Sequence, residues 1–204
     1  NTRLAILGLT FGENLLKDSN EYELLITDKA DLAGLPEGII EAARMTAEEK
    51  STSAEASADK EKGWLFNLDY PSYLPFMMYS DKRELRKQMY MAFNSRAFKN
   101  NANNNESTLK EMAEMRHKRA QLLGYKSHAA IVLEERMAET PEKVHHLLDE
   151  LLQFAKPVAL EELTEIQNLS NKLKGPNPIE RWDFSYYSEK VKNEKFEIND
   201  ELLK

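Results

Sequence analysis

The stretch KVHHLLDELL (Lys143 to Leu152) combines the residue types of a metal site with helical spacing. His145 and Asp149 lie four residues apart, as do His146 and Glu150, so each pair could meet on one side of a helix. A zinc site, however, needs at least three protein ligands that converge on one point. The opposite side of the same helix would carry only apolar residues (Val144, Leu147, Leu148, Leu151 and Ala155). The pattern therefore predicts an amphipathic helix whose leucines face inward and whose histidines face solvent.

Other catalytic motifs are missing from the sequence. A zincin helix carries HExxH, in which the glutamate activates the metal-bound water, but no histidine of this chain is followed by glutamate. His117 and His128 stand alone, and we expect each to be a surface or packing residue. Ser127 beside His128 does not indicate a triad, because neighbouring side chains diverge, and the chain has neither a G-x-S-x-G elbow nor a phosphate loop. The sequence therefore assigns no catalytic, cofactor-binding or metal-binding residue to this chain.

Composition excludes several classes of function. The 204 residues carry 28 basic and 35 acidic side chains, a net charge of −7, so no basic field favours nucleic acid as a partner. The absence of cysteine removes disulfides and thiolate chemistry and fits a reducing compartment, so a cytoplasmic location is the default expectation. Apolar runs are far shorter than the roughly 20 residues of a membrane span, so no membrane partner is expected. The chain does not begin with Met, so any targeting signal is unreadable.

The first half of the chain has the only sequence segments typical of strands. A helix is expected close to the first residue, because Leu4, Leu7, Phe11 and Leu15 recur every three to four positions. Residues 22–27 and 63–70 are short, apolar and bounded by turn formers, and they are predicted to pair as a small sheet. Between them we expect a helix over Pro36 to Glu49. The small and charged residues from Ser51 to Lys62 then predict a mobile linker.

The second half reads as helical almost throughout. Asp81 and Glu84 have the spacing of a capping box, which predicts a helix from Lys82 to Phe98. Asn100 to Ser107 is predicted to be a surface loop. Thr140 with Pro141 is typical of a helix start, and Pro157 should kink that helix. Further helices are expected over residues 108–124, 127–137 and 182–195, and another is expected to start at residues 199–203.

The pattern as a whole predicts a mainly α fragment with a small two-stranded β element. We expect residues 1–204 to form a single helical fragment rather than separate domains. Methionines within the apolar helical patterns are expected to fill the core; these are Met77, Met78, Met89, Met91, Met112, Met115 and Met137.

Four blocks of the chain, in order, resemble the thimet oligopeptidase and peptidyl-dipeptidase family of zinc metallopeptidases. The blocks are YELLITDKADLAGLPEGII, LDYPSYLPFMMYSDKRELRKQMYMAFNSR, LLGYKSHAAIVLEERMAETPEKV and WDFSYYSEKVKNEKFEINDELLK. The oligopeptidase A-like or peptidyl-dipeptidase branch is the most similar, and the sequence leaves open which. The resemblance implies a larger, two-lobed helical peptidase, with a channel for short peptides and zinc held by HExxH and a further glutamate downstream of this chain.

The function expected from this resemblance is that of a middle portion of a zinc-dependent peptidase. The fragment would supply scaffold and part of the channel wall, with zinc bound outside this chain and none bound within it. Its expected partners are short peptides and the missing C-terminal catalytic region. The fragment alone is expected to be inactive. The alternative is a stand-alone helical interaction module without peptidase activity.

Overall fold

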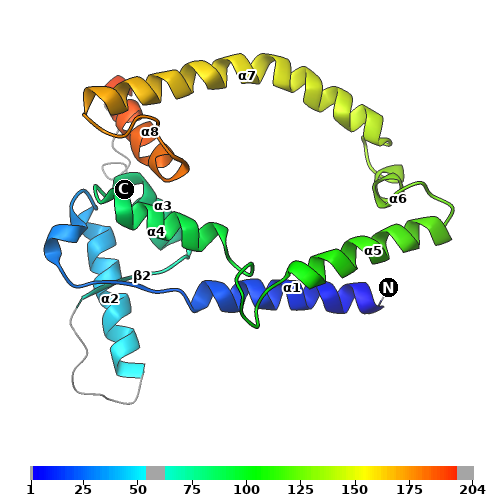
Figure 1. Cartoon of the computed structure of the whole chain (residues 1–204), viewed down its shortest axis with the longest axis horizontal. Helices are drawn as coiled ribbons and strands as arrows, with labels where there is room; N and C mark the ends of the chain where they lie inside the picture. The colour runs from blue at the N-terminus through cyan, green and yellow to red at the C-terminus, as the bar shows by residue number, and fades with distance from the viewer. Residues whose placement is uncertain (1, 54–62, 197–204) are drawn as a thin grey trace. The chain divides into compact units, whose positions relative to one another are not determined.

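The computed structural model describes residues 2–53 and 63–196 (Figure 1). These residues form eight α-helices, one short 3-10 helix and two strands, which confirms the predicted mainly α fold. No helix among them is long and apolar enough to span a membrane. In chain order the elements are α1 (Thr2–Asn20), β1 (Leu24–Ile26), η1 (Lys29–Leu32), α2 (Glu37–Ser53), β2 (Trp64–Phe66), α3 (Tyr70–Tyr79), α4 (Arg83–Asn94), α5 (Glu106–Leu122), α6 (His128–Glu134), α7 (Pro141–Lys172) and α8 (Arg181–Phe196).

The contacts of the backbone divide the chain into two compact units. Unit 1 comprises Asn1–Lys17 and Ala97–Leu163, and unit 2 comprises Asp18–Arg96 and Thr164–Lys204. The boundaries fall inside α1 and α7, so each of these helices contributes to both units. That residues 1–204 form a single fragment stays a prediction.

Unit 2 contains the small sheet. The strands β1 and β2 pair antiparallel, with Leu24 opposite Phe66 and Ile26 opposite Trp64, which confirms the predicted pairing. Side chains alternate across a strand, so Leu24 and Ile26 are buried while Leu25 between them is exposed. The ring of Phe66 packs edge-to-face on Phe76 of α3, with ring centroids 4.8 Å apart.

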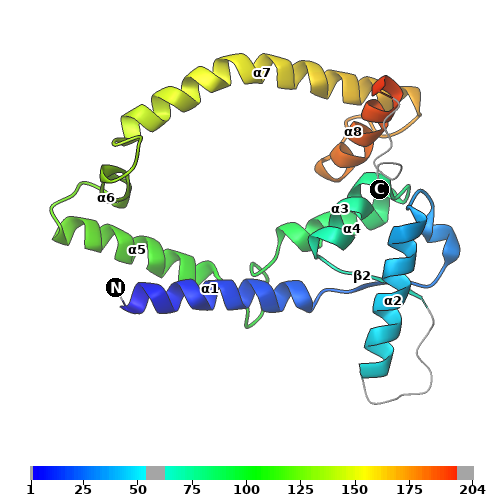
Figure 2. The same ribbon diagram turned by 180° about the vertical axis from the view of Figure 1, so that it is seen from behind.

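The main hydrophobic core of the described residues belongs to unit 2. The helices α3, α4 and α8 lie together in both views (Figures 1 and 2). Met77 and Met89 are buried among them, as predicted. The core prediction is wrong for Met91 and Met137, whose side chains are exposed, because an apolar helical pattern does not say which turns find a partner. Buried members of this core are Leu24, Ile26, Leu32, Leu35, Ala43, Phe66, Leu68, Tyr73, Phe76, Met77, Met89 and Ala92.

The predicted capping box at the start of α4 is wrong. The N-cap residue is Lys82, and no side chain makes a cap hydrogen bond there. The carboxylate of Asp81 instead accepts a hydrogen bond of 2.7 Å from the hydroxyl of Tyr186 on α8. The side chain of Asp81, which the local pattern predicts as a helix cap, therefore makes a tertiary contact instead.

The helix starts in unit 1 agree better with the sequence. Ser127 caps α6 by accepting from the N–H of Ala130, and the hydroxyl of Thr140 accepts from the N–H of Lys143 at the start of α7. The helix α7 then runs without a break through Pro157. Both starts were predictable because the capping residue and the amide that it accepts from are only three residues apart.

The asparagine-rich loop before α5 is only partly at the surface. Asn105 is 2% exposed, which contradicts its assignment to a surface loop. Its Nδ2 donates to the carbonyl oxygen of Phe11 across 2.9 Å, and its Oδ1 accepts from Asn14 across 3.0 Å. This side chain therefore joins the loop to α1 within unit 1, where α1 and α5 lie side by side in both views (Figures 1 and 2).

Two further predictions fall largely outside the described residues. The helix α2 continues through Ser53, so Ser51 to Ser53 are helical rather than part of a linker. The rest of the predicted mobile segment, residues 54–62, and the helix predicted to start at residues 199–203 lie outside the described residues.

Candidate functional site

In the histidine-rich stretch of α7, the histidines are exposed as predicted, but the leucines on the opposite side are exposed as well. His145 and His146 are exposed, and Nε2 of His146 lies 3.6 Å from Oε1 of Glu150. The prediction that the leucines face inward is wrong for the described part of unit 1. Leu147 and Leu151 are each 56% exposed. Periodicity identified the apolar face of this helix correctly, but it could not reveal whether another element covers that face.

The other two histidines are dispersed. His117 is exposed on α5, and His128 is partly buried at the first turn of α6. Within residues 2–53 and 63–196, no three side chains of His, Cys, Asp or Glu gather where they could hold a metal ion. This part of the chain therefore offers no donor set for zinc.

The most developed polar arrangement in unit 2 is an ionic cluster of Arg83, Arg86 and Asp183. Asp183 belongs to the first turn of α8, and its side chain is fully buried, as is that of Arg86 on α4. Nη2 of Arg86 donates to Oδ1 of Asp183 across 3.0 Å, and Nη2 of Arg83 donates to Oδ2 across 2.9 Å. The N–H of Glu180 also donates to Oδ2 across 3.0 Å. One carboxylate of α8 therefore holds two guanidinium groups of α4.

Aromatic rings surround the ionic cluster. The guanidinium of Arg86 lies 4.0 Å from the centroid of the Tyr186 ring, and that of Arg83 lies 5.6 Å from the Trp182 ring. Such cation–π contacts stabilise a charge that has lost its water. Nη1 of Arg86 donates to the carbonyl oxygen of Ser80 across 2.7 Å. The buried charge of Arg86 is therefore compensated on several sides.

The pKa of Asp183 shows the balance between burial and these donors. Burial raises the pKa of the carboxyl, but hydrogen bonds from Arg83, the Glu180 amide and Arg86 outweigh it, and the net pKa lies below its ordinary value. Burial and the hydrogen bond to Asp81 both raise the pKa of Tyr186. The carboxylate is thus held ionised and fully engaged, an arrangement suited to joining α4 to α8 rather than to moving a proton.

Sequence reasoning missed this cluster. Arg83 and Arg86 are three residues apart and share a face of α4, but their partner lies about a hundred residues further along the chain. The only local signal was an aspartate in the first turn of a predicted helix, where the helix dipole already favours a negative charge.

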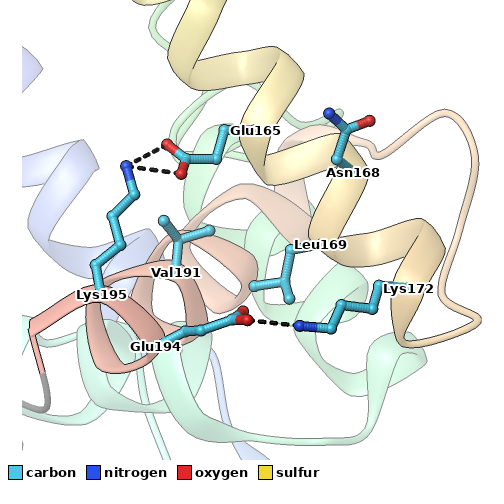
Figure 3. Close-up of a pocket in the computed structure, with 7 residues that line it drawn as sticks. All are labelled: Glu165, Asn168, Leu169, Lys172, Val191, Glu194 and Lys195. Carbon is cyan, nitrogen blue, oxygen red and sulfur yellow. Dashed lines mark hydrogen bonds and ion pairs between the residues drawn. The ribbon is translucent and has the colours of Figure 1, made fainter.

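A shallow groove lies between the last turns of α7 and the end of α8, with a volume of about 320 Å³. Figure 3 shows Leu169 and Val191 between two ion pairs. Lys195 of α8 reaches Glu165 of α7 across 2.6 Å, and Lys172 of α7 reaches Glu194 of α8 across 2.5 Å. Asn168 completes the lining.

The groove offers little chemistry. Each of its charged side chains already has a partner of opposite sign, and its lining holds no histidine, serine or threonine. The turn after α7 passes tightly over buried groups, because a Cβ on Gly175 would collide with the hydroxyls of Tyr187 and Ser170. We therefore interpret the groove as a helix contact and not as a catalytic site.

Comparison with known proteins finds peptidases both among family models and among individual relatives. A sequence model described as peptidase family M3 matches residues 76–204. Oligopeptidase A from Escherichia coli and that from Salmonella typhimurium are each 37% identical to this chain over 100% of its length. Dipeptidyl carboxypeptidase from Escherichia coli is 31% identical, also over 100% of the chain. In all three cases the chain covers 29% of the relative, so it spans less than a third of the length of these proteins.

Proposed function

The chain belongs to peptidase family M3, and from this premise we propose that the protein containing it is a zinc-dependent peptidase that hydrolyses short peptides. One observation carries the proposal: the similarity to oligopeptidase A extends over the whole of these 204 residues at 37% identity. Similarity over a whole chain supports a shared overall chemistry more strongly than a short motif does. The names of the relatives include both an oligopeptidase and a dipeptidyl carboxypeptidase, so internal cleavage and release of dipeptides are both compatible with the proposal.

The part played by these residues would be scaffold and part of the channel wall. This is supported by the polar chemistry of unit 2, where the ionic cluster of Arg83, Arg86 and Asp183 joins α4 to α8 through a fully buried carboxylate. It is also supported by the groove between α7 and α8, where opposite charges neutralise each other. The reacting groups would be supplied by other parts of the polypeptide.

The zinc ion of the proposed enzyme does not fit the described residues. No three potential ligands come together in residues 2–53 and 63–196, whereas a catalytic zinc site needs three protein ligands and an open position. We therefore place the metal ligands, and the catalytic step, outside the described residues.

The proposal is tested by comparing the complete encoded polypeptide with the 204-residue chain. Both are incubated with short synthetic peptides and with a folded protein, and the products are identified by mass spectrometry. We expect the complete polypeptide to cleave only the short peptides, to lose activity with a chelator and to regain it with zinc. The 204-residue chain should cleave neither substrate. Products shorter by two residues from the C-terminal end would indicate dipeptide release, and fragments from internal positions would indicate an oligopeptidase.

The same experiment decides the alternative. The alternative is a helical interaction module without peptidase activity, for which the exposed leucines of α7 would be a contact surface. A complete polypeptide that cleaves no peptide with zinc present would support that alternative and contradict the proposal. Peptide cleavage by the 204-residue chain itself would contradict the assignment of a non-catalytic role. A cytoplasmic location stays a prediction.

A further inference from the structure

The sulfur chemistry of this chain is confined to methionine. The sequence has eight methionines and no cysteine. A methionine thioether is oxidised to a sulfoxide, and a reductase can return the sulfoxide to the thioether. Because the oxidant must reach the sulfur from water, the exposure of each methionine decides which of them reacts first.

All eight methionines lie within the described residues, and their exposure differs widely. Met77 and Met89 are in the core of unit 2 and are 3% and 0% exposed. Met45 on α2 and Met91 on α4 are about half exposed. Met137 is fully exposed, at 101%. The remaining three are half-buried: Met78, Met112 and Met115.

Met137 lies in the turn that joins α6 to α7 within unit 1 (Figure 1). Backbone hydrogen bonds hold this turn on both sides of the residue. The N–H of Arg136 donates to the carbonyl oxygen of Leu133 across 2.9 Å, and the N–H of Glu139 donates to that of Arg136, also across 2.9 Å. The exposure of the Met137 side chain is therefore a property of a hydrogen-bonded turn and requires no unfolding.

The consequences of oxidation differ between an exposed methionine and a buried one. A sulfoxide adds a polar oxygen to an apolar side chain. In the core around Met89 this oxygen would be buried without a hydrogen-bond donor, and burying an unpaired polar group costs stability. At Met137 water supplies the donors. The same exposure gives a reductase access to the sulfoxide, so the modification at this position is both tolerated and reversible.

We propose that Met137 is a site of reversible oxidation by peroxides. The sulfur attacks one oxygen of hydrogen peroxide, so that an S–O bond forms, the O–O bond breaks and the leaving hydroxide takes the proton of the transferred hydroxyl. The products are methionine sulfoxide and water, and the two electrons that sulfur gives up reduce the peroxide. In the reverse reaction a methionine sulfoxide reductase uses two thiols, which become a disulfide while the sulfoxide oxygen leaves as water. This inference is independent of the proposed peptidase activity.

The test treats the complete encoded polypeptide with hydrogen peroxide and follows each methionine-containing peptide by mass spectrometry. We expect the sulfoxide of Met137 to form at least about tenfold faster than those of Met77 and Met89, because the core protects their sulfurs. Methionine sulfoxide reductase with a dithiol should then remove the added oxygen from Met137. Oxidation of Met137 no faster than that of Met89, or a sulfoxide that the reductase cannot reach, would overturn the proposal.

Two matched variants identify the reacting residue in the intact protein. Met137→Leu and Met91→Leu each remove one exposed thioether and keep a similar side-chain volume. The fastest addition of oxygen should disappear in Met137→Leu and should be unchanged in Met91→Leu. A fastest phase that persists in Met137→Leu, or that disappears in Met91→Leu, would contradict the assignment.

Oxidation in urea tests whether the fold causes the selectivity. In the unfolded polypeptide every methionine is accessible, so the rates at Met137 and Met89 should become similar. A preference for Met137 that persists in urea would show that its sequence neighbours cause the selectivity, and would reject the structural explanation. Circular dichroism of the singly oxidised protein gives a final readout. Its helical signal should match that of the unoxidised protein, and a loss of helix would contradict tolerance at this turn.

Discussion

Arg86 and Asp183 form a buried ion pair across 3.0 Å, although 97 residues separate them in the sequence. Arg86 is 1% exposed and Asp183 is fully buried. The pair connects α4 to the first turn of α8, so two distant parts of unit 2 depend on one carboxylate.

Removal of that carboxylate should destabilise unit 2 strongly. In Asp183→Ala, the guanidinium of Arg86 stays buried without its counter-ion, and breaking a buried pair in this way typically costs about 3–5 kcal/mol. Urea unfolding followed by circular dichroism measures the change in the free energy of unfolding. The control Asp149→Ala removes an exposed carboxylate of α7 and should change stability by less than about 0.5 kcal/mol. Equal losses in the two variants would contradict the structural role of Asp183.

The contribution of Asp183 should depend on pH only under acidic conditions. Burial raises the pKa of this carboxyl, but its hydrogen bonds lower the pKa by more than burial raises it. The net pKa in the folded state therefore lies below the ordinary value of 3.8. The stabilising effect is therefore complete above the unfolded pKa and is lost as the pH falls through the folded pKa.

This dependence is measured as the difference in unfolding free energy between the unaltered chain and Asp183→Asn. The difference should be constant from about pH 5 to pH 8 and should shrink below about pH 4, where the unfolded carboxyl starts to bind a proton. Because other carboxylates titrate equally in both proteins, the subtraction isolates Asp183. A difference that already falls between about pH 7 and pH 5 would indicate a raised pKa instead.

Tyr73 should ionise unusually late. Its ring stacks on Phe93 with centroids 4.1 Å apart, and burial raises its pKa to about 12 from the ordinary 10.0, with Tyr90 adding to the shift and Arg96 opposing it. The unfolded chain therefore loses this proton before the folded chain does. Stability from the neutral phenol is present below pH 10 and is lost as the pH rises towards about 12.

An absorbance titration of tyrosinate checks this expectation. Tyr73→Phe should remove one tyrosine from the last part of the curve, near pH 12. A curve of Tyr73→Phe that keeps the complete late step would show that the step does not belong to Tyr73.

The two adjacent histidines of α7 should be dispensable for metal binding. Both are exposed, and the contact between His146 and Glu150 is an exposed pair of little energetic value. The double variant His145→Ala/His146→Ala of the complete polypeptide should keep the zinc content and the peptidase activity proposed above, and should change stability by less than about 0.5 kcal/mol. Loss of one zinc equivalent by elemental analysis would assign a ligand role to this stretch.

The sequence allowed prediction of those features whose cause is local. The starts of α6 and α7 were predictable because Ser127 and Thr140 cap helices through amides three residues away. The pairing of β1 with β2 was predictable because only two segments had strand composition. Each of these features depends on interactions within a short segment or on a choice between very few candidates.

Features that depend on distant partners were not predictable. Asp81 has the spacing of a cap, but its carboxylate accepts from Tyr186, which lies 105 residues away. Asn105 is in a polar run typical of a loop, but it is buried because Phe11 and Asn14 of α1 satisfy its amide. The same limit applies to Leu147 and Leu151, since periodicity defines their face and says nothing about its cover.

The order of two neighbouring residues, Glu194 and Lys195, matches the order of two opposite charges on α7. Glu165 and Lys172 lie two helical turns apart on α7, and each binds the member of the α8 dipeptide that has the opposite sign. Exchanging the two residues would preserve composition, net charge and helix propensity, yet it would place carboxylate against carboxylate and ammonium against ammonium. The charges of α7 and α8 are thus complementary because of their order along the chain, and a count of charges does not reveal that order.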